Sequence, residues 1–202
     1  RDRWLLSQLS HEAVQRSQVA LMALRPIANE AMLEPLLAFF RQGIETQMKR
    51  GVFNRLRDVL LQLPAHLILP LARKWIRSKS EECRNVARGI FADHAEPCDI
   101  PMMQKLLARS LPDEETNLYL ICDLLEAFAR FEEHGLIPKV AQAYTEMRYA
   151  YGRKLAAKAI HALSPEVFQT DYAQECLCDC DEDTRALAAA YAVSGSHQAK
   201  SL

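Results

Sequence analysis

The stretch that decides the fold is Cys83-Arg84-Asn85-Val86-Ala87-Arg88-Gly89-Ile90-Phe91. If Cys83 is position i, an arginine follows at i+1, a small apolar residue at i+4, and larger apolar residues at i+7 and i+8. These apolar positions lie on one face of an α-helix, because helical side chains return to the same face about every 3.6 residues. The stretch therefore predicts a helix that buries one stripe.

The same sequence frame recurs along the whole chain. Copies begin at Gln15, Val52, Asn117, Gly152 and Thr184, so that successive anchors are 37, 31, 34, 35 and 32 residues apart. In the first copy, Val19, Met22 and Ala23 take the apolar positions. The copies that also carry arginine at i+1 place there Arg16, Arg84, Arg153 and Arg185.

Proline supplies a second marker with the same period. Pro35, Pro70, Pro101 and Pro138 are 35, 31 and 37 residues apart, and each falls in the helix expected to precede a copy of the frame. Gly43 is expected to end the first of these helices. Helical hairpins that repeat every 30 to 40 residues are typical of α-solenoids, in which each hairpin buries its apolar face against its neighbours.

The pattern resembles the HEAT-repeat family, especially its short bacterial-type form. The matching features are the first-helix proline, an acidic turn such as Glu81-Glu82 or Asp181-Glu182-Asp183, and the arginine with spaced apolar residues in the second helix. The resemblance implies an all-α, right-handed superhelix of about six hairpins. We expect one array over residues 1–193, with a truncated first repeat, and a frayed tail over 194–202.

The shared arginine position favours a structural role over ligand binding. An arginine that recurs in register can bridge to an adjacent acidic turn. Binding residues are instead expected among polar residues that differ between copies, on the second helices that usually line the inner curve of such solenoids. By frame position these candidates are Arg57 and Arg88 at i+5, Asp58, Asp123 and Lys158 at i+6, and the neighbouring Lys154.

Catalytic and metal-binding motifs are absent from the sequence. The six glycines are isolated, so no phosphate-binding loop is present, and neither a His-Glu-x-x-His helix nor a nucleophile elbow occurs. Cys176, Cys178 and Cys180 alternate beside acids that disfavour thiolates, and they lack the second cysteine pair typical of zinc sites. Cys176 is expected in the core and the other two in a turn. We predict no enzyme activity, no metal and no cofactor.

The composition limits the kinds of partner and cellular location that are expected. With 25 basic and 26 acidic residues the net charge is −1, which disfavours nucleic acid. The most apolar stretch, residues 59–72, is interrupted by two prolines and is too short to span a membrane. The cysteines fit reduced thiols and a cytoplasmic location better than a disulfide framework.

The sequence thus predicts a non-catalytic scaffold that binds protein partners as part of a larger protein. The chain begins at Arg1 inside an expected helix, so we expect a fragment whose truncated first repeat contacts a neighbouring domain or another subunit. One alternative is a DNA-binding protein similar to the alkylpurine DNA glycosylases, with Asp58 or Asp123 as the catalytic acid. A further alternative is a regulatory segment of a larger enzyme.

Overall fold

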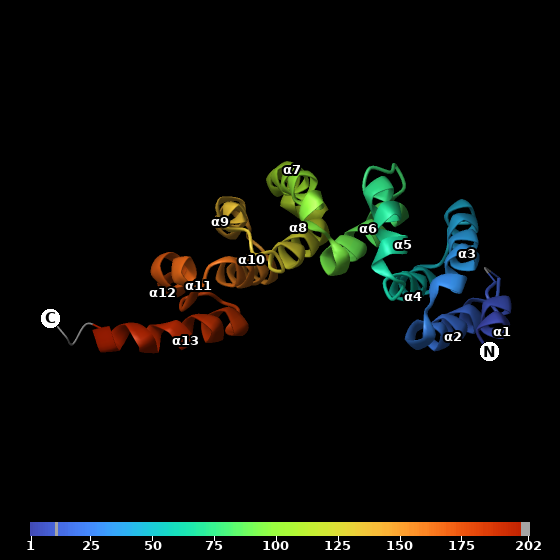
Figure 1. The fold of residues 1–202 in the computed structure, drawn as a ribbon, viewed down its shortest axis with the longest axis horizontal. Coiled ribbons are helices and arrows are strands. Elements are labelled where there is room, and N and C mark those ends of the chain that lie inside the picture. Colours follow the sequence, from blue (N-terminus) through green and yellow to red (C-terminus); the bar gives the residue numbers. More distant parts are fainter. Residues whose placement is uncertain (11, 199–202) are drawn as a thin grey trace. The chain divides into compact units, whose positions relative to one another are not determined.

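The computed structural model describes residues 1–10 and 12–198, with side chains through Tyr191. All regular secondary structure in these residues is helical (Figure 1). The contacts divide the chain into two compact units, one that ends at His94 and one that begins at Ala95. The all-α prediction is confirmed, and each unit is described below by itself.

In the first unit, every helix packs against a neighbour in the chain or its next-but-one neighbour. The contacting pairs are α1 with α2, α2 with α4, α3 with α4, and α5 with α6. The helices are α1 (Asp2–Ser7), α2 (Val14–Leu24), α3 (Leu33–Glu45), α4 (Arg50–Leu60), α5 (Ala65–Trp75) and α6 (Glu81–His94).

In the second unit, α10 is the central helix, in contact with α8, α9, α11 and α13. Helices α7 and α9 contact each other in one row, while α8, α10 and α13 follow one another in a second row (Figure 1). The helices are α7 (Ile100–Ser110), α8 (Glu114–Phe128), α9 (Ile137–Glu146), α10 (Ala150–Leu163), α11 (Pro165–Val167), α12 (Ala173–Cys176) and α13 (Glu182–Gln198), with a π-helical turn at Phe168–Tyr172.

The predicted frame positions form much of the core. In α6 the apolar stripe of the opening stretch is buried, and the corresponding stripes of α4 and α10 are buried as well. These helices form because apolar residues at three- and four-residue spacing gain free energy when they leave water together. The buried stripes are Cys83, Ala87, Ile90 and Phe91 in α6, Val52, Leu56, Val59 and Leu60 in α4, and Gly152, Ala156, Ala159 and Ile160 in α10.

The first copy of the frame begins at Ser17, two residues later than the sequence predicts. Val19 and Met22 are 66% and 54% exposed, whereas Ser17, Leu21 and Leu24 are fully buried in α2. With Ser17 as the anchor, the distance to Val52 is 35 residues (52 − 17), close to the other spacings. A polar anchor is tolerated because the Ser17 hydroxyl donates to the Ser10 carbonyl at 2.6 Å and accepts from the Ser10 amide at 2.8 Å.

The predicted positions of the prolines agree with the structure, whereas the predicted helix end at Gly43 does not. The four spaced prolines lie, as predicted, in the helices that precede α4, α6, α8 and α10, and all four are exposed. Gly43, however, is buried inside α3, which continues to Glu45. The chain leaves that helix through Gln47, which adopts a positive φ of 54°, and the Met48 amide donates to the Gly43 carbonyl at 2.7 Å.

Two further predictions concern a membrane and the tail. Among the described residues, no helix combines the length and apolar character needed to cross a bilayer. In the predicted tail, α13 continues to Gln198, and residues 199–202 lie outside the described part of the chain.

Candidate functional site

Arginines at the shared frame position close the turns between paired helices. Each donates from Nη1 to the two backbone carbonyls that lie five and six residues earlier, in the turn before its own helix. The arginine therefore satisfies carbonyls left open at the end of the preceding segment. The contacts are Arg84 with Ser78 and Lys79 (2.8 and 2.8 Å), Arg153 with Met147 and Arg148 (3.4 and 2.7 Å), and Arg185 with Asp179 and Cys180 (2.8 and 2.9 Å).

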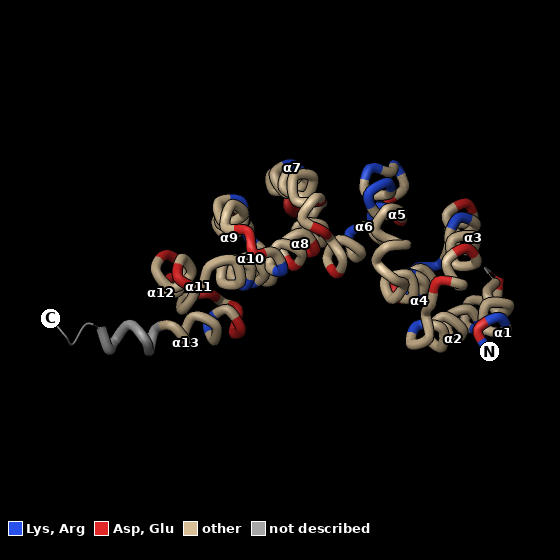
Figure 2. The backbone as a smooth tube through the Cα atoms, viewed as in Figure 1, with Lys and Arg blue, Asp and Glu red and all other residues tan. Residues whose placement is uncertain are grey.

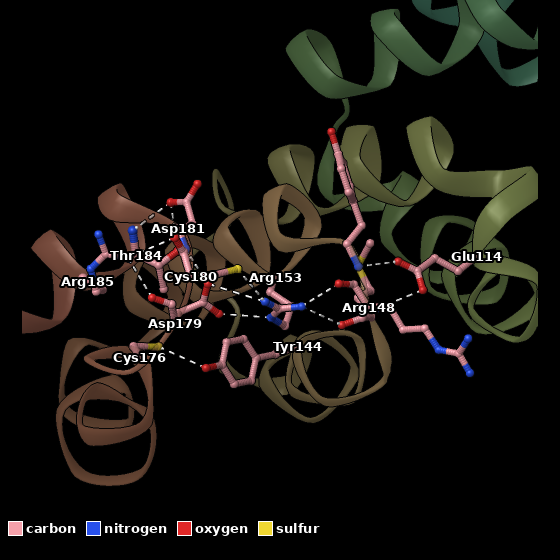
Figure 3. Close-up of polar contacts among 12 residues, drawn as sticks. Glu114, Tyr144, Arg148, Arg153, Cys176, Asp179, Cys180, Asp181, Thr184 and Arg185 are labelled. Carbon is pink, nitrogen blue, oxygen red and sulfur yellow. Dashed lines mark hydrogen bonds and ion pairs between the residues drawn. The ribbon is translucent and has the colours of Figure 1, made fainter.

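For Arg84, Arg153 and Arg185 this geometry agrees with the predicted structural role but differs from the predicted contact. The sequence predicts an ion pair with an adjacent acidic turn, and within the described residues Arg153 alone of the three forms one. Its Nε lies 3.0 Å from Asp179 Oδ2 and its Nη2 lies 3.5 Å from Oδ1 (Figure 3). For Arg16, the carbonyl five residues earlier belongs to residue 11, outside the described residues.

The Arg153–Asp179 pair links α10 to the turn before α13. The Asp179 side chain is only 5% exposed and that of Arg153 is 23% exposed, so water screens the pair little. Burial alone raises the pKa of Asp179, but the hydrogen bonds from Arg153 and from the Asp181 amide outweigh it and leave this pKa below 3.8. The hydrogen bond to Asp179 raises the pKa of Arg153 in turn.

The binding candidates of the first unit lie on α4 and α6. Arg57 on α4 donates from Nη1 to Asn85 Oδ1 on α6 at 3.1 Å. Asp58 lies 3.6 Å from Arg55 on its own helix, with its side chain 27% exposed. Arg57, Asp58 and Arg88 are all half-buried, and Arg57 links α4 to α6 through its hydrogen bond to Asn85.

The binding candidates of the second unit differ in their contacts and exposure. Lys154 contacts Asp183, and Asp181 at 3.8 Å, so it reinforces the link between α10 and the start of α13. The hydrogen bond from Lys154 lowers the pKa of Asp183 and raises its own. Asp123 on α8 is half-buried, and Lys158 on α10 is exposed.

Three exposed tyrosines on or next to two contacting helices are binding candidates that sequence reasoning missed. Tyr119, Tyr149 and Tyr151 are 69%, 47% and 42% exposed and lie on α8 or at the start of α10, two helices in contact. The Tyr149 and Tyr151 ring centroids are 6.1 Å apart, and Lys154 Nζ lies 5.3 Å from the Tyr151 centroid. We call these three residues the tyrosine surface. In the sequence, these tyrosines could have been recognised as aromatic residues that lie outside the apolar frame positions.

A hollow of about 280 Å³ adjoins this surface where α8 and α9 meet the start of α10. Glu114 lies in its wall and accepts hydrogen bonds from the Arg148 and Tyr149 amides at 3.0 and 2.9 Å (Figure 3). Its lining residues are Leu111, Pro112, Asp113, Glu114, Glu115, Glu146 and Arg148. The hollow is open and mainly acidic, and Figure 2 shows acidic and basic segments mixed along α8 and α10.

The grouped metal-ligand atoms in the described residues are those of Glu96, Cys98 and Asp99. Hydrogen bonds account for this cluster without an ion: an Asp99 carboxylate oxygen accepts from the Glu96 amide at 3.1 Å, and Cys98 Sγ lies 3.8 Å from the Glu96 carboxylate. The cluster caps the turn before α7.

Comparison with known proteins gives no identification. The chain matches no protein-family model, no curated protein and no solved structure.

Proposed function

We propose that this chain is a segment of a HEAT-like α-solenoid that serves as a scaffold for protein partners. Support for the solenoid comes from the two rows of helices in the second unit, the buried stripes at matching positions, and the arginines that close successive turns in the same way. Nearest-neighbour stacking of similar hairpins is the defining property of such arrays.

The tyrosine surface is the observation that supports protein binding most directly. Tyrosine offers a large contact area with little side-chain entropy to lose, and it is enriched where proteins bind one another. Tyr119, Tyr149 and Tyr151 lie on adjacent helices and remain substantially exposed. Several shallow contacts along successive helices would hold a partner here.

The charges beside the tyrosines favour a protein partner over nucleic acid. Glu115 and Glu146 are exposed near Tyr149, and Lys154 is already paired with carboxylates. A phosphate backbone requires unneutralised basic residues along its path. The neighbouring acids suit a partner that carries lysine or arginine at its contact surface.

The test is affinity capture with the full chain and with the variant Tyr119→Ala/Tyr149→Ala/Tyr151→Ala. We expect specific proteins to bind the parent chain and to be lost from the variant. The matched control is Val19→Ala/Met22→Ala, which removes similarly exposed side chains from the first unit and should retain the partners. Circular dichroism of each variant checks that the helices persist.

The proposal fails if the tyrosine variant and the parent capture the same proteins. It also fails if no protein binds while duplex DNA or a small molecule raises the melting temperature. Filter binding at low and high salt tests whether duplex DNA is the ligand, because contacts to phosphate weaken steeply as the salt concentration rises.

A further inference from the structure

Two exposed thiols flank the residue on which the turn before α13 depends. Cys178 and Cys180 are both exposed, and Asp179 lies between them. The carboxylate of Asp179 binds Arg153, while the Asp179 and Cys180 carbonyls accept from Arg185. A change in the covalent state of either thiol therefore acts on a turn that holds two helices.

The Cys180 thiol lies beside a guanidinium. Arg153 Nη2 is 3.4 Å from Cys180 Sγ, as Figure 3 shows. A guanidinium in this position can donate a hydrogen bond to the sulfur and stabilise negative charge that develops on it during a reaction. Of the acids that flank this thiol in the sequence, Asp179 is itself paired with the same guanidinium.

The other cysteines differ from Cys180 in burial or surroundings. Cys83, Cys122 and Cys176 are buried. Burial is also the main cause that raises the pKa of Cys122 to about 12 and shifts the pKa of Cys176 upward. Cys98 is exposed as well, with its Sγ 3.8 Å from the carboxylate of Glu96, so it serves as an internal reference for an exposed thiol in a different turn.

We propose that Cys180 and Cys178 form a peroxide-sensitive thiol pair, in which Cys180 reacts first and Cys178 resolves the product. The Cys180 thiolate attacks a peroxide oxygen, so that an S–O bond forms, the O–O bond breaks, and the second oxygen leaves as an alcohol or water after protonation. The Cys178 thiolate then attacks this sulfur, an S–S bond forms, and the oxygen leaves as water. Two electrons pass from the two thiols to the peroxide.

The spacing of the two residues is compatible with a disulfide. Consecutive Cα atoms are about 3.8 Å apart, so residues on either side of one residue in a turn come within the roughly 4.4–6.8 Å that disulfides span. The new bond withdraws Cys180 Sγ from Arg153 and reorients the Asp179 backbone. The contacts of Arg153 with Asp179 and Cys180 then weaken, and so do the hydrogen bonds that Arg185 donates to the Asp179 and Cys180 carbonyls.

The first experiment treats the reduced full chain with hydrogen peroxide and follows each cysteine by peptide mass spectrometry. We expect a Cys178–Cys180 disulfide with the loss of two hydrogens, formed at least several-fold faster than Cys98 is oxidised. Cys178→Ser should stop at a sulfenic acid on Cys180, which dimedone traps. Cys180→Ser should abolish the disulfide, and Cys98→Ser should leave it unchanged. Oxidation of Cys98 and Cys180 at equal rates, or no bond between Cys178 and Cys180, would overturn the proposal.

The second experiment tests the guanidinium and the structural consequence. Arg153→Gln should slow the reaction of Cys180 with iodoacetamide several-fold, whereas Arg153→Lys, which keeps a charge, should retain part of the rate. If Arg153→Gln unfolds the turn, the comparison of Cys180 with Cys98 in the parent chain still decides the matter. Hydrogen exchange should increase in residues 147–153 and 179–185 after oxidation, and unchanged exchange there would refute the proposed effect on the turn.

Discussion

At the scale of the residue, arginine at the shared position acts on the backbone first and on side chains second. Arg84, Arg153 and Arg185 each donate hydrogen bonds to a pair of turn carbonyls, and among the described residues Arg153 alone of these three also pairs with a buried carboxylate. Charge-assisted hydrogen bonds are about twice as strong as neutral ones. The turn before α13 should therefore depend on Asp179 more than other turns depend on their acids.

Asp179→Asn tests this dependence. We expect the free energy of unfolding at neutral pH to fall by about 1–2 kcal/mol, because the ion pair is replaced by a weaker hydrogen bond between the Arg153 guanidinium and a neutral amide. The pKa of Asp179 is lowered in the folded chain from 3.8, so the stabilisation is present above 3.8 and is lost as the pH falls through the lower folded value. The difference between parent and variant should thus narrow below about pH 4.

Urea denaturation at several pH values provides the measurement. Asp58→Asn is the matched control, since Asp58 pairs with Arg55 at 3.6 Å with more of both side chains exposed, and it should change stability little. A constant difference between parent and Asp179→Asn down to pH 3 would contradict the assignment.

Gly152 is a second residue whose role the structure makes specific. A Cβ at this position would lie 2.0 Å from Met147 Cε and 2.8 Å from its Sδ, and Met147 is 3% exposed. We expect Gly152→Ala to destabilise the chain by about 1–2 kcal/mol, because Met147 must be displaced in a packed space and this outweighs the better helix propensity of alanine.

Gly89→Ala is the control for Gly152→Ala. Its Cβ would lie 3.1 Å from the flexible end of Leu61, so we expect stability within about 0.5 kcal/mol of the parent. The double variant Gly152→Ala/Met147→Ala should show coupling, because the contact with the methionine end is removed. Thermal or urea unfolding measures both, and an equal loss at Gly89 would show that helix backbone effects dominate.

At the scale of the element, sequence periodicity predicted the helices well and their ends less well. The stripes of α4, α6 and α10 could be predicted because apolar spacing alone decides which face is buried. The α2 stripe could not, because Val19 and Met22 are as apolar as the residues that are buried, and the anchor is the polar Ser17. Only the contact of Ser17 with Ser10, which is seven residues distant, reveals the correct register.

The candidate site was less predictable for a related reason. The frame position indicates which polar residues lie outside the apolar stripe. It does not indicate which of them form an ion pair or hydrogen bond with a neighbouring helix of the same chain. Lys154 and Arg57 are paired with neighbouring segments, whereas the tyrosine surface consists of residues that lie on α8 or at the start of α10 but outside the apolar frame positions. Such surfaces depend on the contact between α8 and α10 and not on any one repeat.

The end of α3 gives a prediction at this scale. Gln47 has a positive φ of 54°, a conformation that glycine adopts without strain and that costs other residues about 1 kcal/mol. We expect Gln47→Gly to stabilise the chain by about 0.5 kcal/mol, because the relief of strain exceeds the additional entropy of glycine in the unfolded chain. Gln47→Ala keeps a Cβ and should leave stability nearly unchanged, and urea denaturation of the two variants separates strain from any loss of the glutamine side chain.

At the scale of the whole molecule, the two compact units raise the question of how far stability is shared. In an array of helical hairpins each repeat stabilises its neighbours, and stability is approximately a sum of local and nearest-neighbour terms. Helix α10 contacts α8, α9, α11 and α13, so it is the helix whose loss affects most of its unit. Its amides should be among the slowest of the second unit to exchange with solvent.

Ile160→Ala tests this distribution. Ile160 is fully buried in α10, and removal of three carbons should lower the local free energy of unfolding by about 3 kcal/mol. We expect hydrogen exchange to accelerate in α8, α9, α10 and α13, while α5 and α6 of the first unit keep their protection, because the contacts separate the chain at His94 and Ala95. Leu56→Ala, fully buried in α4, is the reciprocal control and should accelerate exchange in α2 and α3 but not in α10. Uniform acceleration across both units in either variant would mean that the chain unfolds as one cooperative body and that the division at His94 has no energetic counterpart.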